Sequence, residues 1–63
     1  MDLGARLKDA RGNIPRETVC KDIGIGLSTL TMYELNQRTP RDEIKKRLAK
    51  YYGISVEALF FAE

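Results

Sequence analysis

The side chains of this sequence that could do chemistry are cations and hydroxyls, while the usual catalytic groups are scarce. The chain has no histidine and a single cysteine, Cys20. It therefore lacks the commonest general base and cannot build a thiolate metal site. No phosphate-binding loop or nucleophile elbow is present, and the acidic pair Asp42-Glu43 lies in a charged helix start rather than in a cleft. We expect no enzyme, no metal, no cofactor and no small-molecule substrate.

The positive charge of the chain is concentrated in its middle. The net charge is only +2. Residues 1–26 contain five Lys/Arg and four Asp/Glu, residues 27–52 contain six and three, and residues 53–63 contain none and two. Because phosphate binding needs a local basic patch rather than a high global charge, this distribution is compatible with a nucleic-acid partner. On charge alone, a mixed solvated surface fits equally well.

The elements that position these groups are all predicted to be helices. Apolar residues recur at helical spacing along the chain, and no segment alternates as a half-buried strand does. The expected boundaries are turn and capping residues: Gly12 after the first helix, Pro15 in the first turn of the second, Asn36 after the third, Thr39 and Pro40 at the N-cap and first position of the fourth, and Ser55 at the N-cap of the fifth. We expect one all-α domain over residues 1–63.

The stretch from Arg16 to Leu35 carries a more specific pattern. With Arg16 as position 1, apolar residues occupy positions 4, 8, 15 and 18, a small residue occupies position 5 and a glycine position 9. These residues are Val19, Ile23, Leu30, Tyr33, Cys20 and Gly24. A small residue lets two helices cross closely, and glycine supplies the positive φ of the turn. This spacing is typical of a helix-turn-helix unit, and it predicts DNA binding by residues 16–35.

Two further stretches are GIGLSTLTMYELNQRTP at residues 24–40 and LAKYYGISVEALFF at residues 48–61. Both resemble the lambda-repressor/Cro-like regulators of the xenobiotic-response-element type. The resemblance implies a compact five-helix domain that places its third helix in the major groove of double-stranded DNA. It also implies a repressor-like transcriptional regulator of a phage, mobile element or bacterium that binds as a homodimer. Gly26 stands where that family usually has a serine or threonine cap.

The resemblance implies roles for residues on and around the third helix. Those expected to contact bases are Leu27, Ser28, Thr31 and Met32. Those expected to contact the DNA backbone are Arg16, Thr29, Gln37, Arg38 and Arg41. Hydroxyls can hydrogen-bond to bases, and apolar side chains can contact thymine methyl groups, which favours A·T-rich targets. The alternatives are helix capping for Ser28 and Thr29, burial or a protein contact for Leu27 and Met32, and solvated surface charge for the arginines.

Further residues have expected roles outside DNA contact. Glu34 is expected to pair with Arg11 or Arg38, and Cys20 to be a small core residue. Tyr51 and Phe61 fit either a dimer surface or the monomer core. The cations predicted to form an ordinary solvated face are Lys45, Lys46, Arg47 and Lys50.

Two broader expectations concern location and a competing function. The single cysteine fits a reducing cytoplasm, and no apolar run approaches the roughly 20 residues of a membrane span. The competing function is a protein-interaction module, antirepressor or antitoxin-like, that kept the fold but lost DNA affinity.

Overall fold

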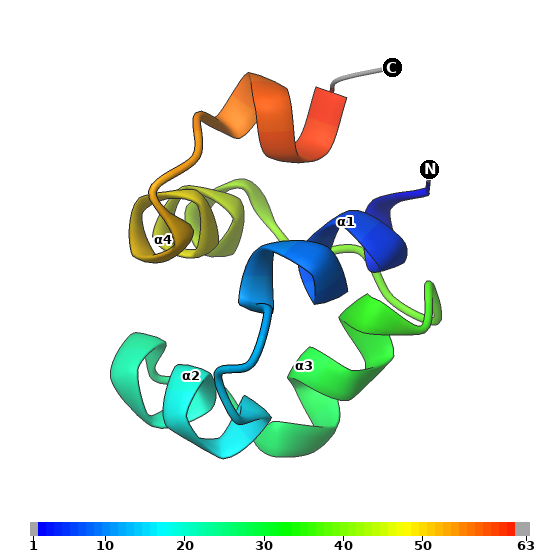
Figure 1. Cartoon of the computed structure of the whole chain (residues 1–63). Coiled ribbons are helices and arrows are strands. Elements are labelled where there is room, and N and C mark those ends of the chain that lie inside the picture. The colour runs from blue at the N-terminus through cyan, green and yellow to red at the C-terminus, as the bar shows by residue number, and fades with distance from the viewer. Residues whose placement is uncertain (1, 62–63) are drawn as a thin grey trace.

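The computed structural model describes residues 2–61, in which helices are joined by short loops. The elements in chain order are α1 (Leu3–Arg11), α2 (Arg16–Ile23), α3 (Leu27–Glu34), α4 (Asp42–Tyr52) and a π-helical turn, η1 (Glu57–Phe61). Figure 1 shows α2 and α3 at one end of the molecule and η1 at the other, with α1 and α4 between them. Residues 2–61 contain no strand, and the predicted all-α fold is confirmed.

The core takes one or more buried side chains from each element. Leu7 of α1, Val19 of α2, Leu30 of α3 and Leu48 of α4 are fully buried, and Leu59 of η1 is almost so. Burial of such a side chain stabilises the fold by about 1.5–3 kcal/mol. Because α3 contributes to this core from one side only, its opposite side remains available for another partner.

Helix α1 packs very closely on α3 because Gly4 has no side chain. A Cβ atom at Gly4 would overlap the carbonyl oxygen of Glu34 and lie 2.8 Å from its carbonyl carbon. The Gly4 N–H donates to Oδ1 of Asn36 at 3.0 Å. Asn36 has a φ of 61°, the left-handed conformation predicted for the end of the third helix. Asn36 therefore ends α3 and also anchors the start of α1.

The predicted start of the fourth helix was wrong by two residues. The N-cap of α4 is Arg41, with φ −68° and ψ 163°, instead of Thr39, and the helix begins at Asp42 instead of Pro40. Pro40 is buried and stays in the extended segment before the helix. The later start places Asp42 and Glu43 in the first turn, where carboxylates interact favourably with the helix dipole.

The second helix also begins one residue later than predicted. Pro15 has the φ of a helical residue, −60°, but its ψ of 143° is extended, and it is the N-cap of α2. Its carbonyl oxygen accepts hydrogen bonds from the N–H groups of Thr18 and Val19 at 3.1 and 3.3 Å. Arg16 consequently becomes the first residue of α2, at the end of the helix that carries the positive dipole.

The C-terminal turn covers part of α4. The predicted cap is confirmed, since the Ser55 hydroxyl accepts a hydrogen bond from the Ala58 N–H at 3.1 Å. The Nζ atom of Lys45 lies 5.6 Å from the ring centre of Phe60 and 5.2 Å from that of Phe61. The prediction that Lys45 belongs to a solvated face was wrong, because its ammonium group lies over these rings and only 16% of the side chain is exposed.

Candidate nucleic-acid interface

The helix-turn-helix unit is built as its spacing predicted. All four apolar positions, Val19, Ile23, Leu30 and Tyr33, are buried. Gly24 ends α2 in the left-handed conformation, with φ 78° and ψ 41°, and the chain then extends to Gly26, the N-cap of α3. The unit thus seats one side of α3 on the core and turns the other side outward.

Cys20 lies in the middle of α2, and its side chain packs against the turn, as its small size predicted. It is 5% exposed, and its Sγ atom is 3.5 Å from the carbonyl oxygen of Gly26. Burial raises the pKa of the Cys20 thiol, which keeps the sulfur protonated and poorly reactive. Residues 2–61 contain no group of three or more His, Cys, Asp or Glu side chains placed to bind a metal, and none of their helices is long and apolar enough to cross a membrane.

The four residues predicted to contact bases lie on the outward side of α3. Leu27 and Ser28 are exposed, and Thr31 and Met32 are partly exposed. The Thr31 hydroxyl donates to the carbonyl oxygen of Leu27 at 2.9 Å. Leu35, at the C-cap, continues this side of the helix and is 56% exposed. Sequence reasoning missed Leu35, although its spacing of four residues from Thr31 and three from Met32 was a readable signal for the same side of the helix.

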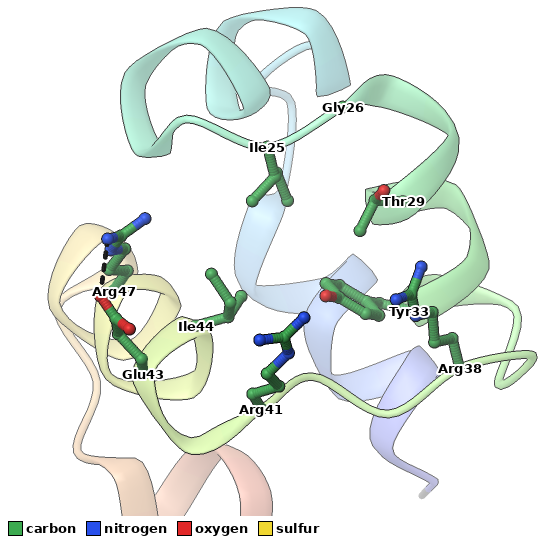
Figure 2. Close-up of a pocket in the computed structure, with 9 residues that line it drawn as sticks. All are labelled: Ile25, Gly26, Thr29, Tyr33, Arg38, Arg41, Glu43, Ile44 and Arg47. Atoms are coloured by element: carbon green, nitrogen blue, oxygen red, sulfur yellow. Dashed lines mark hydrogen bonds and ion pairs between the residues drawn. The ribbon is translucent and has the colours of Figure 1, made fainter.

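Two of the predicted backbone-contacting arginines stand beside a recess between α3 and α4. Figure 2 shows Arg41 directed toward this recess, with Arg38 beside Tyr33 and with Thr29 on the same side of the recess. The recess has a volume of about 320 Å³. Within residues 2–61, Arg38 and Arg41 form no salt bridge, and both are exposed. Gln37, in the same loop, is also exposed.

Arg47 lies at the far edge of the same recess, where sequence reasoning had placed a solvated cation. Its guanidinium donates to Oε1 of Glu43 at 2.8 Å, drawn as a dashed line in Figure 2, and to the carbonyl oxygen of Ile23 at 3.3 Å. The spacing of four residues between Glu43 and Arg47 was a readable signal for this pair. Because Glu43 neutralises Arg47, Arg38 and Arg41 are the cations lining the recess that have no carboxylate partner among the described residues.

Arg16 is held by a buried carboxylate. The Glu34 side chain is only 1% exposed and accepts from Arg11 Nε at 2.7 Å and from Arg16 Nε at 2.9 Å. Burial acts to raise the pKa of Glu34, but the hydrogen bonds and charges of the two guanidiniums outweigh it and hold this pKa below its usual range. Pairing of Glu34 with Arg11 is therefore confirmed, and the second partner is Arg16 rather than Arg38.

The remaining predicted roles can be compared with the positions of the side chains. The hydrogen bonds of residues 2–61 include none that caps α3 through Ser28 or Thr29, and Gly26 makes no side-chain cap. Tyr51 is used within the monomer, since its hydroxyl donates to Oδ2 of Asp22 at 2.7 Å. Phe61 remains 63% exposed.

Comparison with known proteins matches the sequence to a family. A family model described as helix-turn-helix matches residues 6–59. The cryptic phage CTXphi transcriptional repressor RstR of Vibrio cholerae is 32% identical over 57 residues, covering 87% of this chain. That alignment covers 51% of the relative, so the chain spans about half the length of the curated relative it matches.

Proposed function

Because this chain belongs to the helix-turn-helix family, as its likeness to the lambda-repressor/Cro-like regulators predicted, we propose that it is a sequence-specific DNA-binding transcriptional regulator of the repressor type. Helix α3 enters the major groove of double-stranded DNA. The observation that carries this proposal is the outward side of α3, whose side chains are exposed or partly exposed. It is bordered by Arg38 and Arg41, which form no salt bridge within residues 2–61.

The proposed contacts divide into those that read bases and those that hold the backbone. Base contacts come from the outward side of α3, through Leu27, Ser28, Thr31 and Met32. Backbone contacts come from the surrounding helix starts and loops, through Arg16, Thr29, Gln37, Arg38 and Arg41. Phosphate contacts of this kind fix the register of the protein on DNA without reading sequence.

A homodimer is part of the proposal. One short helix reads few base pairs, and a symmetric pair doubles the length of the site. Phe61 is the better of the two predicted dimer residues, because its ring is exposed whereas Tyr51 is bonded to Asp22. We further propose a cytoplasmic location and one domain over residues 1–63, of which residues 1, 62 and 63 lie outside the described part. The family match and the repressor relative do not favour the alternative protein-interaction module.

The proposal is tested by selecting bound fragments from random genomic DNA at about physiological salt. The wild-type protein is compared with the double variant Arg38→Ala/Arg41→Ala. We expect an enriched palindromic motif for the wild type. Each neutralised phosphate contributes about −0.9 to the slope of log affinity against log salt, so losing two contacts per protomer should flatten the slope of a dimer by about 3.6.

The matched control is Lys46→Ala/Lys50→Ala, which removes the same charge from exposed positions of α4. It should retain the motif and most of the salt slope. If the two double variants change the motif and the salt slope equally, Arg38 and Arg41 hold no phosphates. If the wild type enriches no motif and retains no fragment in a salt-sensitive way, the chain is not a DNA-binding regulator.

A further inference from the structure

The outward side of α3 has an unusual chemical composition for a reading surface. Leu27, Ser28, Thr31, Met32 and Leu35 occur at i, i+1, i+4, i+5 and i+8, which places them on one side of a helix of 3.6 residues per turn. Leu27 is 47% exposed and Leu35 is 56% exposed. Helix α3 contains no Lys, Arg, Asn or Gln. The surface therefore consists of apolar side chains around two hydroxyls.

The hydroxyl of Thr31 is already committed within the helix. Its proton is donated to the carbonyl oxygen of Leu27 at 2.9 Å, so it cannot be donated to a base at the same time. Thr31 therefore offers a base only its methyl group and its acceptor lone pairs. Among the described residues, Ser28 then supplies the one hydroxyl of this surface that makes no hydrogen bond and can donate its proton to a base.

This composition limits what the surface can recognise in a major groove. Guanine is usually read by Arg or Lys and adenine by Asn or Gln, and α3 carries none of these. The one apolar group in the major groove is the C5 methyl of thymine. An apolar side chain gains most by burying that methyl group from water, because each buried methyl or methylene contributes a transfer free energy.

We propose that Leu27 and Met32 read DNA through pyrimidine C5 methyl groups, so that thymine is selected for its methyl rather than for its hydrogen-bonding edge. This inference rests on the proposed function and specifies the bases that α3 selects. It extends to 5-methylcytosine, which carries a methyl group on the same ring carbon. Methylation of a cytosine at a contacted position should thus raise the affinity of the protein for DNA.

The test removes single methyl groups from the DNA. Using the operator obtained by selection, each thymine is replaced in turn by deoxyuridine, which lacks the C5 methyl and keeps the hydrogen-bonding edge. We expect about a fourfold loss of affinity for each contacted methyl, as the transfer free energy of one methyl group predicts, and no loss elsewhere. Where a thymine at such a position is replaced by cytosine, methylating that cytosine should raise the affinity by a similar factor.

Protein variants assign each methyl to a side chain. Leu27→Ala and Met32→Ala should each weaken binding to the thymine operator and remove the thymine-to-uridine difference at one position per half-site. Ile14→Ala is the matched control, since Ile14 is an exposed apolar residue outside α3. It should leave every thymine-to-uridine ratio unchanged.

The outcomes separate this inference from the proposed function. If uridine substitution has no effect while binding stays motif-specific and salt-dependent, the methyl-reading inference is wrong and the regulator remains. A G-rich consensus overturns the inference in the same way. If no motif is enriched and binding is insensitive to salt, the regulator itself is rejected and this inference falls with it.

Discussion

Substitution of Gly4 by alanine tests whether the close approach of α1 and α3 stabilises the fold. Alanine normally stabilises a helix relative to glycine, by at most about 1 kcal/mol. At Gly4, however, the new Cβ atom would overlap the carbonyl oxygen of Glu34 and lie 3.0 Å from Nδ2 of Asn36. Since the nearest atoms belong to backbone, the two helices have to move apart.

The expected magnitude follows from these opposing effects. Overpacking of a tight contact costs about 1–3 kcal/mol. Displacing α1 also weakens the hydrogen bond from the Gly4 N–H to Asn36, which contributes about 1 kcal/mol. After the helix-propensity gain is subtracted, Gly4→Ala should lower the free energy of unfolding by about 2 kcal/mol. In a domain of this size that lowers the melting temperature by about 8–16 °C.

The assay is urea unfolding followed by circular dichroism, with Gly26→Ala as the matched control. Gly26 has a φ of −76°, and the nearest atom to its added Cβ, Oγ1 of Thr29, is at an ordinary 3.7 Å. Loss of the glycine cap and reduced freedom of the unfolded chain nearly offset each other there, so the change should be close to zero. If Gly4→Ala is as stable as the wild type, or no less stable than Gly26→Ala, the close-packing argument is refuted.

Two further substitutions test the buried polar groups. The folded-state pKa of Glu34 lies below its unfolded value, so its stabilising effect is complete above the unfolded pKa and is lost as the pH falls through the folded pKa. Urea unfolding between pH 2 and 7 should show this loss of stability at acid pH in the wild type. The free energy of unfolding of Glu34→Gln should depend less on pH and be lower by about 3 kcal/mol near neutral pH. Equal pH dependences of the two proteins would contradict this role of Glu34. The Tyr52 hydroxyl is buried without a hydrogen-bond partner in residues 2–61, and burial raises its pKa to about 12. Tyr52→Phe should therefore be neutral or stabilising by about 1 kcal/mol, and a clear loss of thermal stability would show that the hydroxyl has a partner.

Sequence patterns predicted the features of this fold that depend on neighbouring residues. The buried positions Val19, Ile23, Leu30 and Tyr33 follow from helical periodicity, and the left-handed Asn36 follows from its side chain. Features of this kind can be predicted from the sequence of one helix, given that one side of that helix is buried in a core. They were sufficient to predict the helix-turn-helix unit and the outward side of α3.

Features that depend on how distant segments meet were not predictable in the same way. Helix α4 starts at Asp42, and Pro40 before it is buried, which is not visible in a local capping pattern. The pairing of Arg16 with Glu34 joins residues 18 apart and requires α2 and α3 to be assembled. Charge complementarity alone allowed Arg38 equally well as a partner for Glu34.

The position of Arg16 gives the Glu34 pair a consequence for the proposed function. Glu34 holds the Nε edge of the Arg16 guanidinium at 2.9 Å, while 34% of the Arg16 side chain stays exposed at the start of α2. The long side chain is thus ordered when the protein folds, and the entropy of ordering it is not lost again on binding. Arg38 and Arg41 have no such partner within residues 2–61, so in the proposed complex the DNA itself would have to order them. In the proposed complex, a phosphate contact from Arg16 would therefore cost less ordering entropy than one from either loop arginine.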